Sequence, residues 1–330
     1  MKRALGPALK ILALRMPALA IPALAIPVLL FGSTIRAADA PVVVTSIKPI
    51  HSLVSAIMQG VGEPKLIVDG AASPHTYNLK PSNARALQDA KVIFWVGPGL
   101  EAFLEKPLRA LGRDASIAEL DNAPGLVKLP FREGGAFEPH DDAPEHEHDH
   151  AEADHDHDAF DTHLWLDPMN AKAMAAMITT TLVAADPANA LTYQGNAKAL
   201  NDRLDALDAE IKGIVAPVKG KPFIVFHDAY QYFEHRYGIR VAGSITVSPE
   251  TIPGAERVSE IRHKVGELGA TCVFAEPQFE PRLVNVVIEG TRAKSGVLDP
   301  EAATLKAGPD LYFTLMRGIA DSMKDCLSST

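Results

Sequence analysis

Cysteine is scarce in this chain of 330 residues, which contains only Cys272 and Cys326. No Cys-x-x-Cys spacing occurs, which argues against a metal site built from the pair. No cysteine lies near the N-terminal apolar run, which excludes a lipid-anchored lipoprotein. Two cysteines in an exported chain usually form a disulfide, and two buried free thiols are the alternative.

Positive charge is also in short supply, since the formal net charge is −9. No basic stripe is visible along the sequence, and we therefore expect no nucleic-acid partner. No His-Glu-x-x-His motif lies on a predicted helix, since the one match, at residues 146–150, falls in a predicted loop, and no other general base is paired with a second histidine at helical spacing. This argues against a metal-dependent hydrolase of that type.

The N-terminus has the pattern of a targeting segment. A basic start that includes Lys2 and Arg3 precedes an apolar run over residues 16–31, and small residues at Ala37 and Ala40 offer cleavage sites. A membrane anchor is the alternative, but three prolines break the run and it is short for a bilayer span. We predict that residues 1–37 are a cleaved signal peptide and that the mature chain is soluble in an exported compartment.

The most unusual stretch is residues 138–158, which read EPHDDAPEHEHDHAEADHDHD and lie in a predicted loop over residues 132–160. Ten acids and six histidines occur there without any Lys or Arg. The histidines are His140, His146, His148, His150, His155 and His157. Imidazoles and carboxylates at this density favour divalent cations, chiefly Zn²⁺. A disordered, solubilising insert is the alternative.

Strands alternate with helices along the rest of the chain, which predicts parallel β-α-β units. We expect strands at residues 41–47, 65–69, 91–96, near Ser116, 222–226, 239–242, 271–275 and 296–298. The main helices are expected at residues 52–60, 81–90, 101–111, 230–237, 253–268, 281–294 and 311–325.

This alternation divides into an α/β lobe over residues 38–185 and a second α/β lobe over residues 216–330. Between them, apolar residues at spacings of three and four predict one connecting helix over residues 186–215, on the order of 43 Å long. The alternative is an ordinary helix broken at Gly195. We therefore expect two lobes, each a mainly parallel sheet flanked by helices, with a rigid helix between them.

Ligands bind at the carboxyl ends of strands in open α/β sheets. Five side chains occupy such positions or lie just before a predicted helix: His75, His163, His227, Glu276 and Asp299. Three imidazoles and one or two carboxylates from both lobes can therefore converge in the cleft between the lobes. This set suits Zn²⁺ better than Mn²⁺, which favours more oxygen ligands, although a manganese binder stays an alternative. A zinc hydrolase is a weaker alternative, because three ligands with an open water position can be catalytic.

Several motifs resemble those of the ZnuA family, the periplasmic zinc-binding proteins of bacterial zinc-uptake ABC transporters. The similarity runs over essentially the whole mature chain. It is carried by SIKPIHSLVSAI, DGAASPHTYNLKPS, VIFWVGPGLEAFLEKP, the acidic histidine-rich stretch, HLWLDP, VFHDAYQYFE, TCVFAEPQF and GVLDP.

The resemblance implies a non-enzymatic protein that captures Zn²⁺ and delivers it to a membrane permease with its ATPase, and we expect a monomer. It implies His75, His163 and His227 as zinc ligands and a Cys272–Cys326 disulfide. Some family members have an acid before the first histidine, where this chain has Pro74. The resemblance then favours Asp299 as fourth ligand, with water or a loop imidazole as alternatives. Glu276 is expected to orient an imidazole through its other ring nitrogen.

Overall fold

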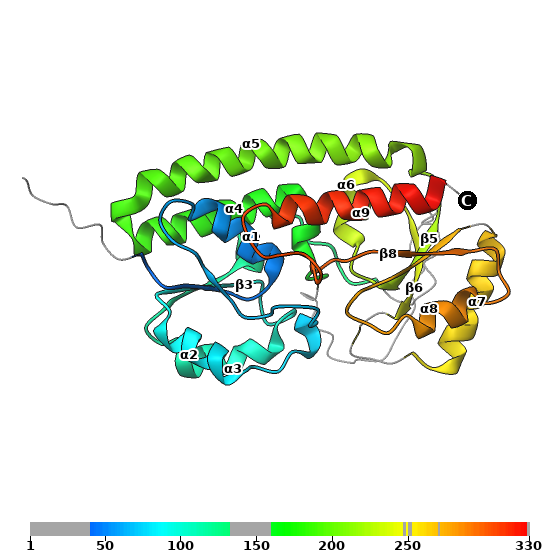
Figure 1. The fold of residues 1–330 in the computed structure, drawn as a ribbon, viewed down its shortest axis with the longest axis horizontal. Helices are drawn as coiled ribbons and strands as arrows, with labels where there is room; N and C mark the ends of the chain where they lie inside the picture. Colours follow the sequence, from blue (N-terminus) through cyan, green and yellow to red (C-terminus); the bar gives the residue numbers. More distant parts are fainter. Residues whose placement is uncertain (1–39, 133–159, 247–248, 250–252, 270, 329–330) are drawn as a thin grey trace, which may run out of the picture. The chain divides into compact units, whose positions relative to one another are not determined.

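Four parallel strands in the order β2-β1-β3-β4 form the first sheet (Figure 1). The computed structural model describes residues 40–132, 160–246, 249, 253–269 and 271–328. The strands are β1 (Val43–Thr45), β2 (Lys65–Leu66), β3 (Val92–Trp95) and β4 (Ser116–Glu119). β1 and β3 are entirely buried, which explains their continuous apolar runs. The predicted signal peptide and the six loop histidines lie outside the described residues.

The helices of this lobe flank the sheet. They are α1 (Lys48–Ile57), α2 (Pro81–Asp89), α3 (Ala102–Leu111) and α4 (Pro168–Ala185). α1 begins four residues earlier than the periodicity predicts, because Pro49 fits the first helical turn and lacks the N–H that this turn leaves unpaired. α4 begins as predicted, since the Asp167 side chain accepts from the backbone N–H of Met169 at 2.8 Å.

The second sheet repeats this topology with the parallel order β6-β5-β7-β8. Its strands are β5 (Phe223–His227), β6 (Val241–Thr246), β7 (Cys272–Ala275) and β8 (Lys294–Val297). Its helices are α6 (Gln231–Tyr237), α7 (Ala255–Leu268) and α8 (Arg282–Ile288). In each sheet the first strand in chain order lies between the second and the third. A residue at the carboxyl end of a strand in one sheet therefore has a counterpart at the matching strand of the other sheet.

One expected helix is shorter than predicted. The prediction extended a helix from residue 281 to residue 294, whereas α8 ends at Ile288 and β8 already begins at Lys294. Gly290 has a φ of +75°, a left-handed conformation that glycine adopts readily and that turns the chain out of the helix. Residues 291–294, which the prediction placed in the helix, therefore belong to the turn and to the start of β8.

The helix α5 (Ala190–Val215) runs alongside both sheets, as Figure 1 shows. Short 3₁₀ turns precede it at Pro187–Asn189 and follow it at Ala216–Val218. The predicted apolar face is confirmed, because its five members are at most 2 % exposed: Leu200, Leu204, Leu207, Ile211 and Val215. The helix continues through Gly195, so the predicted long connecting helix is correct and the broken alternative is wrong.

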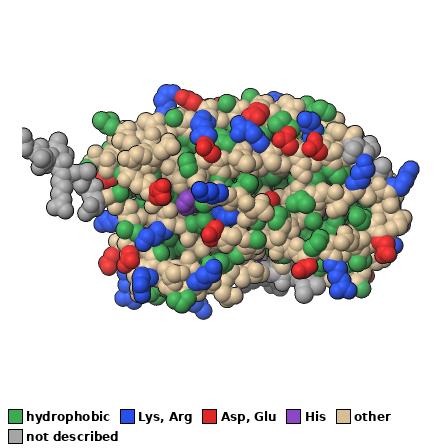
Figure 2. Space-filling model, in the orientation of Figure 1, with side chains coloured by type: hydrophobic (Ala, Val, Ile, Leu, Met, Phe, Trp, Pro, Cys, Tyr) green, Lys and Arg blue, Asp and Glu red, His purple; other side chains and the backbone are tan. Residues whose placement is uncertain are grey.

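The C-terminal helix α9 (Leu311–Ser328) packs beside α5, contacts α1 of the first lobe, and runs from the middle of the molecule along the second lobe (Figure 1). Two ion pairs join the helices, Arg203–Asp310 at 2.6 Å and Arg317–Glu210 at 2.8 Å. Glu210 lies seven residues after Arg203, and Arg317 lies seven residues after Asp310. Partner residues therefore advance together along the chain, and the two helices run in the same direction. Figure 2 shows acidic and basic side chains interspersed along the edge formed by α5.

One hydrophobic core extends from the first sheet through α1, α4, α5 and α9 to β5 and β7. A smaller cluster lies between the second sheet and helices α7 and α8. Because the large core is shared, sliding one sheet past the other would disrupt well-packed apolar contacts. The lobe boundaries at residues 185 and 216 remain a prediction, because the helices of the two lobes pack together in one layer. In the described part of the chain no helix is both long and apolar enough to cross a bilayer.

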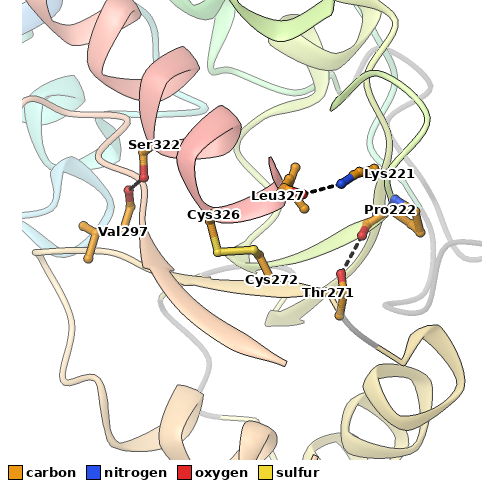
Figure 3. The surroundings of a disulfide bond; sticks show 8 residues. All are labelled: Lys221, Pro222, Thr271, Cys272, Val297, Ser322, Cys326 and Leu327. Atoms are coloured by element: carbon orange, nitrogen blue, oxygen red, sulfur yellow. Dashed lines mark hydrogen bonds between the residues drawn. A yellow bond between two sulfur atoms is a disulfide. The ribbon is translucent and has the colours of Figure 1, made fainter. Parts of the chain in front are cut away.

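Cys272 and Cys326 form a disulfide, as predicted, and tie β7 to the end of α9 (Figure 3). The free-thiol alternative is wrong. Next to this bond, the Lys221 ammonium donates to the carbonyl of Leu327, and the Ser322 hydroxyl donates to the carbonyl of Val297. The C-terminal helix is therefore fixed to the second sheet by one covalent bond and two hydrogen bonds.

Candidate metal centre

Three histidines from three different elements meet at the carboxyl ends of the sheets. His75 lies in a 3₁₀ turn, Pro74–Thr76, which follows β2, and its backbone N–H donates to the Ser73 hydroxyl at 3.3 Å. His163 directly precedes the turn Leu164–Leu166 that leads into α4. His227 is the last residue of β5. These are the strand-end and helix-start positions that the sequence predicts.

The ring nitrogens of the three imidazoles converge. The Nε2 atom of His163 lies 3.4 Å from Nε2 of His75 and 3.3 Å from Nε2 of His227. One potential ligand atom from each histidine lies within 4.8 Å of the other two. Among the described residues, this is the one group of three or more His, Cys, Asp or Glu side chains that meets this criterion.

The spacing of these nitrogens suits a small tetrahedral ion. Ligands at about 2.0–2.1 Å in a tetrahedron lie about 3.3–3.4 Å apart, and this is the Zn–N distance of imidazole ligands. The two Nε2–Nε2 distances of 3.4 and 3.3 Å have this value. Two of the three separations between these imidazoles therefore already have the value that tetrahedral Zn²⁺ requires.

A carboxylate fixes the orientation of His163 from behind. The Nδ1 atom of His163 lies 2.7 Å from Oδ1 of Asp161, and the same oxygen accepts from the His163 backbone N–H at 3.0 Å. A carboxylate only accepts hydrogen bonds, so Nδ1 of the neutral ring carries the proton and Nε2 presents its lone pair. Asp161 is fully buried, which makes this orientation durable.

Glu276 does the same for His227. Nδ1 of His227 lies 2.7 and 2.8 Å from the two carboxylate oxygens of Glu276, which follows β7. The Tyr230 hydroxyl donates to Oε1 of Glu276 at 3.2 Å and so holds the carboxylate. The structure thus places Glu276 behind an imidazole, as the sequence predicts. Such outer partners raise the basicity of the imidazole as a ligand.

The imidazoles differ in their affinity for protons. Burial, together with the neighbouring His163 and His227 rings, lowers the pKa of His75 to about 2, so that ring is neutral at any physiological pH. Burial alone would lower the pKa of His227, but the Glu276 carboxylate outweighs it and raises the pKa above the ordinary value. Protons therefore compete with a metal for His227 far more than for His75.

Asp299 lies outside the converging group. Its Oδ1 accepts from the Gln278 side-chain amide at 2.9 Å and from the Glu301 backbone N–H at 3.2 Å. No hydrogen bond to its Oδ2 occurs among the described residues, so one oxygen is available to a ligand. The six loop histidines, from His140 to His157, lie outside the described residues.

A buried ion-pair cluster lies beside the histidines. The Arg132 guanidinium contacts both carboxylate oxygens of Asp228, which follows His227 directly, and both oxygens of Glu234 on α6. Arg132 is the last described residue before the histidine-rich stretch. The Tyr232 hydroxyl also donates to the carbonyl of Asp161 at 2.6 Å. These contacts attach the described residues on either side of that stretch to α6.

Sequence reasoning missed Asp161 and Arg132. The pattern Asp161-Thr162-His163 is the available signal for the first, because an Asp two residues before a ligand can reach both its backbone N–H and its ring. Arg132 gave no such signal. Its partners are about a hundred residues away, and only the fold brings them together.

Comparison with known proteins agrees with this architecture. The ZnuA family, described as "Zinc-uptake complex component A periplasmic", matches residues 43–326. A high-affinity zinc uptake system protein ZnuA from Brucella suis biovar 1 is 56% identical over 316 residues, covering 90% of this chain and 94% of the relative.

Two solved structures show the same fold. A crystal structure of a ZnuA has a TM-score of 0.71 at 24% identity and covers 88% of this chain and 100% of that chain. The periplasmic zinc binding protein TroA from Treponema pallidum has a TM-score of 0.73 at 20% identity, with coverages of 87% and 99%.

The two-lobed parallel fold and the histidine cluster define a solute-binding protein of the metal-uptake type. The chain belongs to the ZnuA family of periplasmic zinc-uptake components.

Proposed function

We propose that this protein captures one Zn²⁺ ion in the periplasm and delivers it to a zinc-import permease driven by an ATPase. His75, His163 and His227 bind the ion through their Nε2 atoms. The observation that carries this proposal is the pair of Nε2–Nε2 distances, 3.4 and 3.3 Å, which match the ligand separation of tetrahedral zinc. Family membership favours zinc binding over the manganese and hydrolase alternatives.

Asp299 supplies the fourth ligand through Oδ2, the oxygen that accepts no hydrogen bond from a described residue. Gln278 and the Glu301 backbone hold the other oxygen and so limit the rotation of the carboxylate. A water molecule at the fourth position is the competing arrangement. Replacing Asp299 by Ala distinguishes the two, because loss of a carboxylate ligand lowers zinc affinity, whereas a water ligand is unaffected.

The histidine-rich stretch acts as a zinc-capture segment at the edge of this site. The nearest described residues on either side are close to the site, because Arg132 contacts Asp228, which follows His227, and Phe160 lies three residues before His163. Deleting residues 138–158 should lower the number of zinc ions bound while leaving one tight site. Unchanged stoichiometry would contradict this role.

The test of the main site is zinc titration against a chromophoric chelator with each ligand histidine changed to Ala. We expect His75→Ala, His163→Ala and His227→Ala each to weaken the tight site by more than the roughly 10- to 100-fold that loss of an outer partner costs, since each removes a ligand itself. His263→Ala is the matched control, because this imidazole is exposed on α7 beside Glu267. Retention of the tight site in all three ligand variants would refute the assignment.

The delivery step predicts a complex with the permease and a monomeric binding protein. The partner is the membrane complex of the zinc-uptake system that gives the family its name. Sedimentation of the zinc-loaded protein should give a single species with the mass of one chain. A stable dimer would contradict the proposed monomer without affecting the metal site.

A further inference from the structure

Lys48 is an unusual residue for the buried start of a helix. It is the first residue of α1 in the first lobe, and its side chain is only 4% exposed. Lysine is almost never fully buried unless its charge is paired. Its nearest carboxylate, on Asp69, lies 3.8 Å away and is largely exposed, which makes it a weak partner.

The ammonium group is instead held by backbone carbonyls of the second lobe. Lys48 Nζ donates to the carbonyls of Ala302 at 3.0 Å, Ala303 at 2.9 Å and Leu305 at 3.0 Å. A lysine ammonium has three donors, so this set satisfies all of them. The three carbonyls belong to the segment between β8 and α9, about 250 residues away in sequence.

The backbone of that segment is bent to make this contact. Ala302 has a φ of +57°, the only positive φ of a non-glycine residue among the described residues. An L-residue adopts this conformation only where the surroundings hold it there. The turn at Ala302 brings carbonyls of neighbouring residues toward one point, and that point is occupied by Lys48 Nζ.

The same segment carries Asp299, three residues before Ala302. A second contact from the first lobe reaches it, since Nε1 of Trp165 donates to the carbonyl of Pro300 at 2.9 Å. The Trp165 ring also lies next to the His163 ring, with centroids 5.4 Å apart. The segment that carries Asp299 is therefore held by two side chains of the opposite lobe.

We infer that Lys48 is a positioning residue for the metal site: its ammonium holds the 299–305 segment so that Asp299 reaches the zinc bound by the three histidines. This inference rests on the proposed function and on Asp299 as fourth ligand. Removing the ammonium releases the carbonyls of Ala302, Ala303 and Leu305. The segment then loses its tie to α1, and the Asp299 carboxylate is no longer held at the ion.

The test is a double-mutant comparison of zinc affinity with Lys48→Met and Asp299→Ala, alone and together, by competition with a chromophoric chelator. Lys48→Met keeps the apolar stem and removes the charge. We expect Lys48→Met to lose about tenfold in affinity, as substitutions of outer partners commonly do, and Asp299→Ala to lose at least as much, because it removes a ligand. The double variant should bind no more weakly than Asp299→Ala alone, because Lys48 acts through Asp299.

A spectroscopic readout separates positioning from general destabilisation. With Co²⁺ in place of Zn²⁺, the visible absorption of Lys48→Met should shift in the same way as that of Asp299→Ala. Arg317→Met is the matched control, since it breaks an exposed ion pair between α9 and α5 without touching the segment. It should leave both the spectrum and the affinity unchanged. If Lys48→Met fails to fold, Lys48→Gln is measured in its place, and the same ranking of zinc affinities is expected.

Wild-type affinity and spectrum in Lys48→Met would overturn the inference, and so would additive losses in the double variant. If Asp299→Ala binds zinc as tightly as the wild type, this inference and the fourth-ligand proposal both fail. The three-histidine site is judged separately by the His75→Ala variant.

Discussion

Replacing Glu276 by Gln isolates the contribution of a carboxylate that does not touch the metal. The side chain lies behind His227, with both oxygens within 2.8 Å of Nδ1, and is only 3% exposed. Glutamine has nearly the same shape and keeps one oxygen that can accept from Nδ1–H. The substitution therefore removes a negative charge and leaves the packing almost unchanged.

The expected loss of zinc affinity is moderate. Substitution of such outer partners costs about 10- to 100-fold in metal affinity, which corresponds to about 1.4–2.7 kcal/mol. The loss in Glu276→Gln should lie near the lower end of this range, because one oxygen that can accept from Nδ1–H remains. Glu276→Ala should fall near the upper end, because water has little access to replace the acceptor at this buried position.

The same substitution should make zinc binding less sensitive to acid, although it weakens binding at neutral pH. In the wild type, Glu276 raises the pKa of His227, so protons begin to displace zinc at a higher pH on acidification. Without the carboxylate, burial dominates and lowers the pKa of His227, so proton competition begins at a lower pH. The variant is thus weaker than the wild type at neutral pH, and the two affinities approach each other in acid.

The assay is competition with a chromophoric chelator at several pH values between about 5 and 8, where an ordinary histidine titrates. Glu267→Gln is the matched control, because Glu267 pairs with the exposed His263 far from the cluster. An unchanged affinity in Glu276→Gln, or an onset of zinc loss at a higher pH than in the wild type, would refute this reasoning.

Three further substitutions test how the scaffold supports the site. Arg132→Ala leaves two buried carboxylates unpaired and should destabilise folding by about 3–5 kcal/mol. The control Arg317→Ala breaks an exposed ion pair and should cost at most about 1 kcal/mol. Equal chemical-denaturation midpoints of the two variants would contradict this. Cys326→Ser opens a loop with a sequence separation of 54 residues. It should cost about 4 kcal/mol by chain entropy in thermal unfolding, and zinc affinity should stay unchanged. Gly195→Ala should stabilise α5 by about 0.5–1 kcal/mol, since an added Cβ meets no atom within 4 Å; a lower melting temperature would refute it.

The positions of the three histidines could be predicted because sheet topology determines them. His75 and His227 follow strands, and the carboxyl ends of parallel strands share one edge of a sheet. His163 precedes a strong helix-start signal at Asp167-Pro168. These are local features, and a regular α/β alternation is enough to bring them together. The connecting helix was predictable for a similar reason, because its apolar spacing is regular.

Contacts between distant residues could not be predicted in this way. The Lys48 side chain meets carbonyls about 250 residues away, and Arg132 meets carboxylates about a hundred residues away. Neither contact has a periodic signal, and the left-handed turn at Ala302 lacks the glycine that usually marks such a position. The end of α8 was missed because the predicted helix was extended through Gly290, whose left-handed conformation turns the chain out of the helix.

The most direct test is anomalous diffraction at the zinc absorption edge from crystals of the zinc-loaded protein. We expect one fully occupied peak about 2.0–2.1 Å from each Nε2 atom of His75, His163 and His227. Asp161 and Glu276 should still accept hydrogen bonds from Nδ1 of His163 and His227. Absence of a peak at these three Nε2 atoms, or coordination through Nδ1 of these rings, would contradict it.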